Sequence, residues 1–253
     1  MRAARSILIT GASSGIGAAL ANAYAAPGVH LALTGRNQAR LDDTRAAVSA
    51  RGATCDAACV DVTDRREMDR WIARCDAEHP LDLVVANAGI SPGTSAADDE
   101  VEQTRRVFAV NIGGVVDTVL AALPGMTARG SGQIAIMASL AAFAVAPDAH
   151  AYCASKFAVR AWGEGLRGHL ARRGIAVSVI CPGFVESRMT AVNPHPKPGL
   201  IDADRAAAII MRGLAANRGR IVFPWWLYAI SRVAGALPPD LLARLARQFR
   251  RGA

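Results

Sequence analysis

Short apolar runs alternate with helical stretches along most of the chain, and this alternation is the feature that most restricts the fold. The apolar runs predict strands at 6–10, 30–35, 53–60, 81–89, 133–139, 175–183 and 220–223. The stretches between them predict helices at 17–25, 38–50, 65–77, 100–122, 151–172 and 202–217. Strands this apolar, joined by helices, indicate a parallel sheet covered on both faces, because parallel strands need crossover connections. The predicted fold is α/β: a single doubly wound Rossmann domain, with a seven-stranded parallel sheet flanked by helices and a C-terminal helical extension.

Neither an internal repeat nor a linker divides the chain. We expect residues 1–224 to form one catalytic and dinucleotide-binding domain, and residues 225–253 to form the extension. In the extension one helical face carries Leu241, Leu245, Gln248 and Phe249, and the arginines at 244, 247, 250 and 251 lie largely elsewhere.

The extension has two interpretations. In the first, it packs on its own domain or on a partner subunit. In the second, the basic amphipathic segment and Trp225 and Trp226 make weak contact with an anionic membrane surface. We also hypothesise that Trp225, Trp226, Leu227 and Tyr228, which follow the last predicted strand, wall an apolar substrate pocket.

A glycine-bearing turn, TGASSGIG at 10–17, follows the first predicted strand and opens the first predicted helix. Gly11 permits the tight turn, Gly15 lets the backbone approach a pyrophosphate, and Gly17 lets helix and strand pack closely. The spacing is GxxxGxG, so it matches neither GxGxxG nor the phosphate loop of nucleotide triphosphatases. The alternative is a glycine-rich turn without a ligand. In the cofactor interpretation, the contacts come from Gly11, Ser13, Ser14, Gly15, Ile16 and Gly17.

The end of the second predicted strand bears on which cofactor is bound. An acid there would bind the ribose hydroxyls of NAD, whereas an arginine accommodates the 2′-phosphate of NADP. The sequence reads LTGRN, with no acid and with Arg36. This favours NADP(H), with NAD(H) as the alternative. Asp61 and Val62 end the third strand, where an adenine ring would rest.

Composition argues against several other classes of protein. The net charge is +8, but the arginines are spread along the chain and concentrate only at its two ends, so we expect no nucleic-acid partner. The five cysteines lack metal-ligand spacing, so we expect no metal. No run of about 18 apolar residues and no signal peptide is seen, which predicts a cytoplasmic protein.

Tyr152 and Lys156 form a pair that carries chemistry. Of 29 basic residues only Lys156 and Lys197 are lysine. Positions four apart share one helical face, so the phenol and the ammonium point into the same cleft. The charge should lower the pKa of Tyr152 towards neutrality, where the phenol both donates and accepts a proton. Ser139 ends the fifth predicted strand, at the sheet edge where such folds place ligands.

These motifs together resemble the short-chain dehydrogenase/reductase family, over about residues 5–223. The matching positions are the turn 10–17, Asn87-Ala88-Gly89, Asn111, Ser139, Tyr152 with Lys156, and Pro182-Gly183 followed by Val185 and by Ser187 in place of a common threonine. Two departures are Ser14, where many NADP-preferring relatives carry a basic residue, and Ala86, which replaces a frequent asparagine.

The resemblance implies hydride transfer between a nicotinamide and a carbonyl or alcohol carbon. It implies that Tyr152 is the general acid or base and that Ser139 polarises the carbonyl. Lys156 would bind the nicotinamide ribose, and Asn111 would anchor a water that relays protons to Lys156. We expect a hydrophobic ketone or aldehyde as substrate, and a homodimer or homotetramer. The alternative of another class, a non-catalytic dinucleotide-binding sensor or scaffold, could lose the Ser, Tyr and Lys that are retained here.

Overall fold

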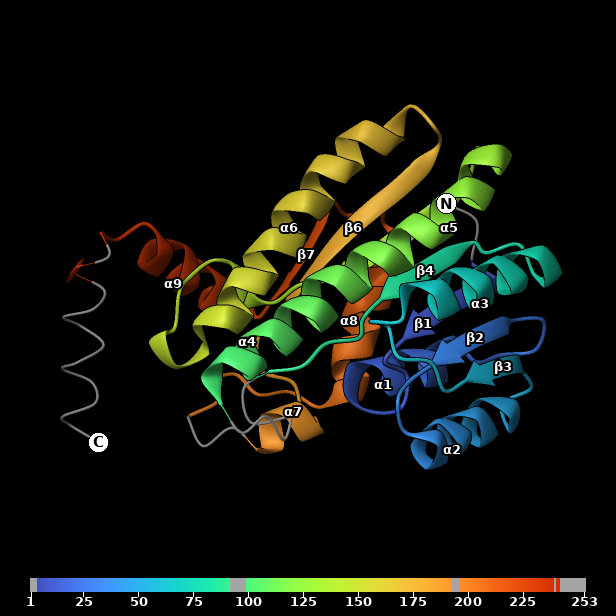
Figure 1. Ribbon diagram of the computed structural model, residues 1–253, viewed down its shortest axis with the longest axis horizontal. Coiled ribbons are helices and arrows are strands. Elements are labelled where there is room, and N and C mark those ends of the chain that lie inside the picture. Colours follow the sequence, from blue (N-terminus) through green and yellow to red (C-terminus); the bar gives the residue numbers. More distant parts are fainter. Residues whose placement is uncertain (1–3, 92–98, 193–195, 239, 242–253) are drawn as a thin grey trace.

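A single parallel sheet forms the centre of the molecule (Figure 1). The computed structural model describes residues 4–91, 99–192, 196–238 and 240–241. Seven strands lie in the order β3-β2-β1-β4-β5-β6-β7, all parallel, as the alternating pattern predicts. The strands are β1 (Ser6–Thr10), β2 (His30–Thr34), β3 (Thr54–Ala58), β4 (Leu83–Ala86), β5 (Gly132–Met137), β6 (Ile175–Pro182) and β7 (Arg220–Phe223).

Helices cover both faces of the sheet (Figure 1). One layer consists of α3 (Arg65–Glu78), α4 (Glu100–Phe108), α5 (Val115–Arg129) and α6 (His150–Ala171). The other layer consists of α1 (Gly15–Tyr24), α2 (Gln38–Ser49) and α8 (Ala203–Ala215). Each strand packs against both helical layers, because successive side chains of a strand point to opposite faces of the sheet. Leu8 packs toward α3 and α5, whereas Ile7 and Ile9 pack toward α1 and α8.

The strand order places the chemistry-bearing residues at one edge of the sheet. The connections reverse direction between β1 and β4, and ligands of doubly wound sheets bind at the carboxyl ends of the strands beside this point. Gly11 follows β1, Asn87 follows β4 and Ser139 follows β5. Sequence positions more than a hundred residues apart therefore meet at a single cleft edge.

The predicted helix 100–122 differs in detail from the structure. A π-helix, Ala109–Gly114, separates α4 from α5 and contains Asn111, and α5 continues to Arg129. By length and composition the whole stretch Glu100–Arg129 could cross a membrane, and 44% of its most apolar window is buried inside the molecule. Val107, Val115 and Val119 of this stretch belong to the core.

The C-terminal extension begins as a helix, α9 (Trp225–Gly235), which lies at one end of the molecule (Figure 1). A helical extension was predicted, and this part of it is confirmed. The predicted face of Leu241, Leu245, Gln248 and Phe249 lies outside the described residues except for Leu241, which is exposed. The division of the chain at residue 224 stays a prediction.

A pair of stacked histidines lies at the amino ends of the strands, opposite the edge that carries Ser139. It predicts how the stability of the fold depends on pH. The rings of His30 and His79 are stacked with centroids 3.7 Å apart, and His30 Nδ1 lies 3.0 Å from Thr54 Oγ1. Burial, followed by the neighbouring His79, lowers the pKa of His30, although Asp56 and Glu78 oppose this. The unfolded chain then binds more protons than the folded one, so stability should fall as the pH drops below about 6.5.

We expect His30→Gln to reduce this loss of stability in acid. Glutamine keeps a polar group near Thr54 but takes up no proton. Urea unfolding followed from neutral pH into the acidic range measures the effect, with the exposed His169→Gln as the control. Equal acid sensitivity of the wild-type protein and His30→Gln would contradict this account.

Candidate active site

The glycine turn has the backbone conformation that a close ligand approach requires. Gly11 and Gly15 have φ angles of +67° and +55°, a region that side chains with a Cβ rarely adopt. A Cβ on Gly17 would collide with the carbonyl of Gly11 and would lie 2.6 Å from Asn87 Nδ2. Asn87 holds the turn in place, because its Nδ2 donates to the carbonyls of Thr10 at 2.9 Å and Gly11 at 3.3 Å.

The amino end of α1 is left open for an anion. Ser14 occupies the N-cap position without a side-chain hydrogen bond to the helix, and the first turn carries no acid. In contrast, Asn37, Asp64 and Asp202 cap α2, α3 and α8. Uncapped N–H groups at a helix start favour phosphate. An open groove of about 500 Å³ runs past this end, lined by Ser14, Gly15, Ala18, Ala19, Asn22, Glu186, Ser187, Arg188, Asp202, Ala203 and Asp204.

Two of the predicted cofactor contacts, Gly15 and Ser187, line this groove together. Gly15 is close to Ser187, since a Cβ on Gly15 would lie 3.1 Å from Ser187 Cβ. Ser187 caps the short helix α7 (Arg188–Ala191) through a capping box with Thr190. Arg188, which sequence reasoning missed, is exposed and lines the same groove. The signal for it was its position directly after Ser187.

The predicted adenosine contacts lie at the ends of β2 and β3. Arg36 Nη1 is 3.9 Å from Asp61 Oδ2, and both side chains are about half exposed. Asp61 Oδ1 accepts from the backbone N–H and hydroxyl of Thr63 at 2.9 and 2.8 Å. A Cβ on Gly35 would lie 2.9 Å from Ser13 Oγ, so the glycine turn lies close to this corner, and Val62 is buried. The structure therefore brings the guanidinium, the carboxylate and the turn to one side of the edge.

Ser139 and Tyr152 meet beside the end of β5. Ser139 Oγ accepts from Ala141 N at 3.1 Å and lies 3.4 Å from the carbonyl of Pro182. Tyr152 lies in the first turn of α6 and is half-buried. Burial raises the pKa of Tyr152, and the hydrogen bond from the Ser139 side chain lowers it to a smaller extent. The two hydroxyl groups thus form one unit.

Lys156 lies one helical turn further along α6 and is buried. Its Nζ donates to the carbonyl of Met137 at 2.9 Å and lies 5.7 Å from the centroid of the Tyr152 ring. Burial lowers the pKa of Lys156 to about 8. A Cβ on Gly89 would lie 3.3 Å from Asn111 Oδ1 and 3.5 Å from Lys156 Nζ, so these three residues converge.

The prediction that Lys156 lowers the pKa of Tyr152 towards neutrality is wrong. The pKa of Tyr152 is raised rather than lowered towards neutrality, because burial outweighs the other influences. Lys156 is itself desolvated, and its Nζ donates to a backbone carbonyl. Tyr152 is therefore held in the protonated form, which is the form that donates a proton.

Asn111 is fully buried, and both of its amide hydrogens are occupied. Nδ2 donates to the carbonyl of Ile90 at 2.9 Å and to Ser155 Oγ at 3.1 Å, while Oδ1 accepts from Ile90 N at 2.8 Å. A carbonyl oxygen has a second lone pair. Only that lone pair of the side chain, near Lys156 Nζ, is left to hold a water. Ser155 donates in turn to the carbonyl of Tyr152 at 2.7 Å.

The segment after β6 borders the same edge. Gly183 N donates to the carbonyl of Phe223 at 2.7 Å, and Val185 is buried. A Cβ on Gly183 would lie 3.0 Å from Pro224 Cδ and 3.3 Å from Leu227 Cδ2. The start of α9 therefore lies directly against the predicted nicotinamide side of the site.

A cluster of arginine and aromatic side chains fastens α9 beside Ser139. Phe143, four residues after Ser139, lies edge to face with Tyr228 at 4.9 Å, and the guanidinium of Arg160 lies 4.6 Å from its ring centroid. Arg220 pairs with Glu164 and donates to Tyr228 Oη at 2.9 Å. Sequence reasoning missed this cluster, because its members come from four separate parts of the chain.

Thr10 is a second residue that sequence reasoning treated only as part of the turn. Its Oγ1 accepts from the backbone N–H groups of Asn87 at 3.0 Å and Ala88 at 3.1 Å. These bonds tie the end of β1 to the segment after β4. The hydroxyl next to the first glycine was the available signal.

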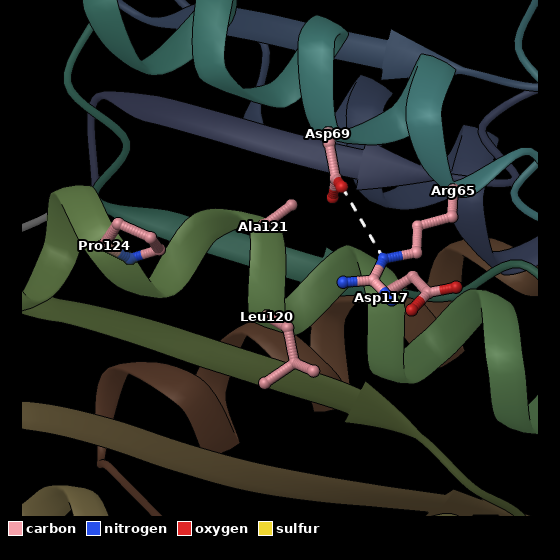
Figure 2. A pocket seen from close by; sticks show the side chains of 6 residues that line it. All are labelled: Arg65, Asp69, Asp117, Leu120, Ala121 and Pro124. Carbon is pink, nitrogen blue, oxygen red and sulfur yellow. Dashed lines mark ion pairs between the residues drawn. The ribbon is translucent and has the colours of Figure 1, made fainter.

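Another hollow, of about 300 Å³, lies between α3 and α5 (Figure 2). It is lined by Arg65, Asp69, Asp117, Leu120, Ala121 and Pro124, and Arg65 pairs with Asp69 at 3.7 Å. None of these residues borders the glycine turn or the Ser139 and Tyr152 pair. Within the described part of the chain, no group of three or more His, Cys, Asp or Glu side chains could hold a metal ion.

The residues fit a dinucleotide. The glycine turn leaves space that a Cβ would fill, the amino end of α1 is uncapped, and a serine, a tyrosine and a lysine lie at the same sheet edge. This fold and this group of residues define a nicotinamide-dependent oxidoreductase. The family described as short chain dehydrogenase matches residues 5–197, and the chain belongs to that family.

Relatives and solved structures agree with this assignment. An uncharacterized oxidoreductase of Myxococcus xanthus is 37% identical over 97% of this chain and 98% of its own length. One from Mycobacterium tuberculosis is 34% identical over 95% of this chain and 96% of its own length. A short-chain dehydrogenase from Sphingobium yanoikuyae in complex with NADPH superposes with a TM-score of 0.78 at 25% identity, covering 87% of each chain. One from Burkholderia phymatum in complex with NAD gives 0.81 at 25%, covering 90% of this chain and 92% of that one.

Proposed function

We propose that the protein is an NADP(H)-dependent oxidoreductase that interconverts a carbonyl compound and an alcohol, with a hydrophobic ketone or aldehyde as the carbonyl substrate. The observation that carries this proposal is the meeting of Ser139, Tyr152 and Lys156 at the sheet edge that also holds the glycine turn. When bound, the nicotinamide supplies or accepts the hydride.

The proton chemistry is assigned to this chain's own side chains. In the reducing direction Tyr152 Oη donates a proton to the substrate oxygen. The raised pKa of its phenol keeps the group protonated before that step. Ser139 Oγ donates a hydrogen bond to the same oxygen. Lys156, with a pKa of about 8, can take up and release a proton near neutral pH and so restores the proton of Tyr152. In oxidation the direction reverses.

Two further residues position Lys156 and Tyr152. Asn111 Oδ1 and Lys156 Nζ converge beside Gly89, so a water held between them would connect Lys156 to solvent. Ser155 bridges Asn111 to the backbone of Tyr152 and fixes the start of α6.

The cofactor is assigned to the groove and the adjoining strand ends. Gly11, Gly15, Gly17 and the amino end of α1 would hold the diphosphate, with Ser13, Ser14 and Ile16 in the same turn. Asp61, Val62, Asn87, Ala88 and Gly89 would border the adenosine, and Pro182, Gly183, Val185 and Ser187 the nicotinamide. Arg36 would turn from Asp61 to the 2′-phosphate of NADP(H). Arg188 would contact the diphosphate, which NADP(H) and NAD(H) share.

Two arginine variants separate these assignments. Arg36→Ala should weaken NADPH binding about tenfold to a hundredfold and change NADH binding about twofold at most, because only NADPH carries the 2′-phosphate. Arg188→Ala should weaken both about fivefold, since an exposed pair contributes about 1 kcal/mol. Titration of cofactor fluorescence measures both effects, with Arg188→Lys as the charge-preserving control. Equal loss of NADPH and NADH affinity in Arg36→Ala would overturn the preference for NADP(H).

The substrate assignment rests on the apolar side of the cleft. Leu227 lies against Gly183, and a Cβ on Gly199 would lie 2.9 Å from the ring of Trp226. Phe143, four residues after Ser139, packs edge to face against Tyr228 of the same helix and holds α9 beside the site. A series of ketones, aldehydes and alcohols of increasing size, assayed with NADPH and with NADH, tests the assignment. Turnover should rise with apolar bulk, and preference for small polar carbonyls would contradict it.

The other candidates are tested by the same assay. NAD(H)-dependent chemistry would appear as faster turnover with NADH. A non-catalytic dinucleotide sensor would bind cofactor and turn over no member of the series.

We further propose a cytoplasmic location and a homodimer or homotetramer, which cell fractionation and light scattering of the purified protein would test.

A further inference from the structure

The outer face of α9 is apolar and exposed. It consists of Trp225, Trp226, Ala229, Ile230 and Val233, and we call these five residues the α9 outer face. The exposed fractions of Trp225, Ile230 and Val233 are 76%, 57% and 67%. Trp226, Ile230 and Val233 recur at the helical repeat, so they form one stripe, with Trp225 on its flank.

The inner face of α9 is occupied by the protein itself. Leu227 and Tyr228 pack against the core, and Gly235 contacts the carbonyl of Phe143. The helix is therefore apolar on two opposite sides, and none of its residues is fully buried. Such a helix is normally covered on both sides. Exposed apolar patches of this kind mark interaction surfaces.

The charge around this face favours an anionic surface. Arg232 is exposed and lies on the flank of the α9 outer face, beside Trp225 in the helical projection. Twelve residues follow Leu241, and four of them are arginines. From Trp225 to the end, the chain has five arginines and one acid, Asp240. Tryptophan and arginine around an aliphatic stripe are typical of helices that bind the membrane interface.

The same charges argue against a second copy of this chain as the partner that covers the α9 outer face. A two-fold interface brings the same patch of both subunits together. It would bring each Arg232, on the flank of the α9 outer face, close to Arg232 of the second copy. Like charges in contact cost free energy, whereas anionic headgroups gain it.

From these observations we propose that the α9 outer face docks on an anionic lipid surface. Trp225, Ile230 and Val233 insert at the boundary of headgroups and acyl chains, and Arg232 pairs with headgroup phosphates. Pro224, directly before α9, lies against Gly183, and a Cβ on Gly199 would lie 2.9 Å from the Trp226 ring. Docking thus brings the segment assigned to the nicotinamide close to the lipid, where an apolar substrate would dissolve; this last point rests on the proposed function.

Vesicle co-sedimentation of the full-length protein tests the proposal. The vesicles contain phosphatidylcholine with or without phosphatidylglycerol. The double variant Ile230→Ser with Val233→Ser should bind the anionic vesicles at least about tenfold more weakly than wild type. Both side chains are exposed, so the fold should tolerate the changes. Val101→Ser, which replaces a 61% exposed valine on α4, is the matched control and should bind like wild type.

Each other outcome overturns the proposal. The proposal is wrong if the wild-type protein does not bind anionic vesicles. Binding that survives Ile230→Ser with Val233→Ser, but is lost on removal of residues 242–253, would assign docking to the arginine-rich end alone. If the wild-type protein instead self-associates without binding vesicles, and the double variant does not self-associate, a second copy of the chain would be the partner that covers the α9 outer face. Turnover of a water-soluble ketone should be equal in wild type and double variant, so a failed reaction would not be mistaken for failed docking.

Discussion

Replacing Tyr152 by phenylalanine is expected to lower kcat about a thousandfold or more, while the dissociation constant for NADPH changes about threefold at most. The phenol is the group assigned to move a proton to the substrate oxygen, and general acid–base groups contribute on this scale. Phenylalanine keeps the ring in its packed position on α6. Steady-state turnover and cofactor fluorescence titration measure the two quantities separately.

Tyr24→Phe is the matched control, because Tyr24 lies on α1, and it should turn over like wild type. Full activity of Tyr152→Phe would refute the assignment. Loss of NADPH binding in the same variant would instead give Tyr152 a structural part in the cofactor site.

Replacing Lys156 by methionine is expected to lower kcat about a hundredfold and, in the protein without cofactor, to raise the free energy of unfolding. Burial lowers the pKa of Lys156 from 10.5 to about 8, which corresponds to a cost of about 3 kcal/mol for the charged form. The lost hydrogen bond to Met137 offsets about 1 kcal/mol. The net gain in stability should be about 2 kcal/mol.

The pH dependence of this gain has a definite sign. Between about 8 and 10.5 the unfolded chain binds more protons at Lys156 than the folded one. The contribution of Lys156 to wild-type stability therefore rises across that range, and the advantage of Lys156→Met over wild type should shrink. Urea unfolding at a pH below 8 and at one near 10.5 measures this. Lys156→Arg should lose both activity and stability, because a guanidinium is larger and cannot release its proton. A less stable Lys156→Met protein would contradict the account.

Much of this fold follows from local patterns. The strand β1 has three consecutive apolar residues, β6 is apolar apart from Ser178, and the turn between β1 and α1 has a glycine at each tight position. Tyr152 and Lys156 could be paired because helical spacing alone puts them on one face. The resemblance to the family then supplied Asn111 and the segment around Pro182, which no local pattern singles out.

The remainder depends on tertiary packing. The depth at which Tyr152 is buried decides the direction of its pKa, and no spacing in the sequence reports that depth. The π-helix around Asn111 accompanies the bonds of its side chain to Ile90 and Ser155, which lie far from it in the sequence. The contact of Phe143 with Arg160 and Tyr228 joins positions far apart in the chain. Charge–aromatic contacts of this kind leave no periodic signal in the sequence.

The most direct test of the central claim follows the hydride itself. NADPH deuterated at its transferable nicotinamide position is incubated with wild-type protein and a bulky apolar ketone, and the alcohol formed is analysed by mass spectrometry and NMR. The account predicts one non-exchangeable deuterium on the carbinol carbon for each NADPH oxidised, and no such product with Tyr152→Phe. Oxidation of NADPH without deuterium on that carbon, or no oxidation with any carbonyl compound, would contradict it.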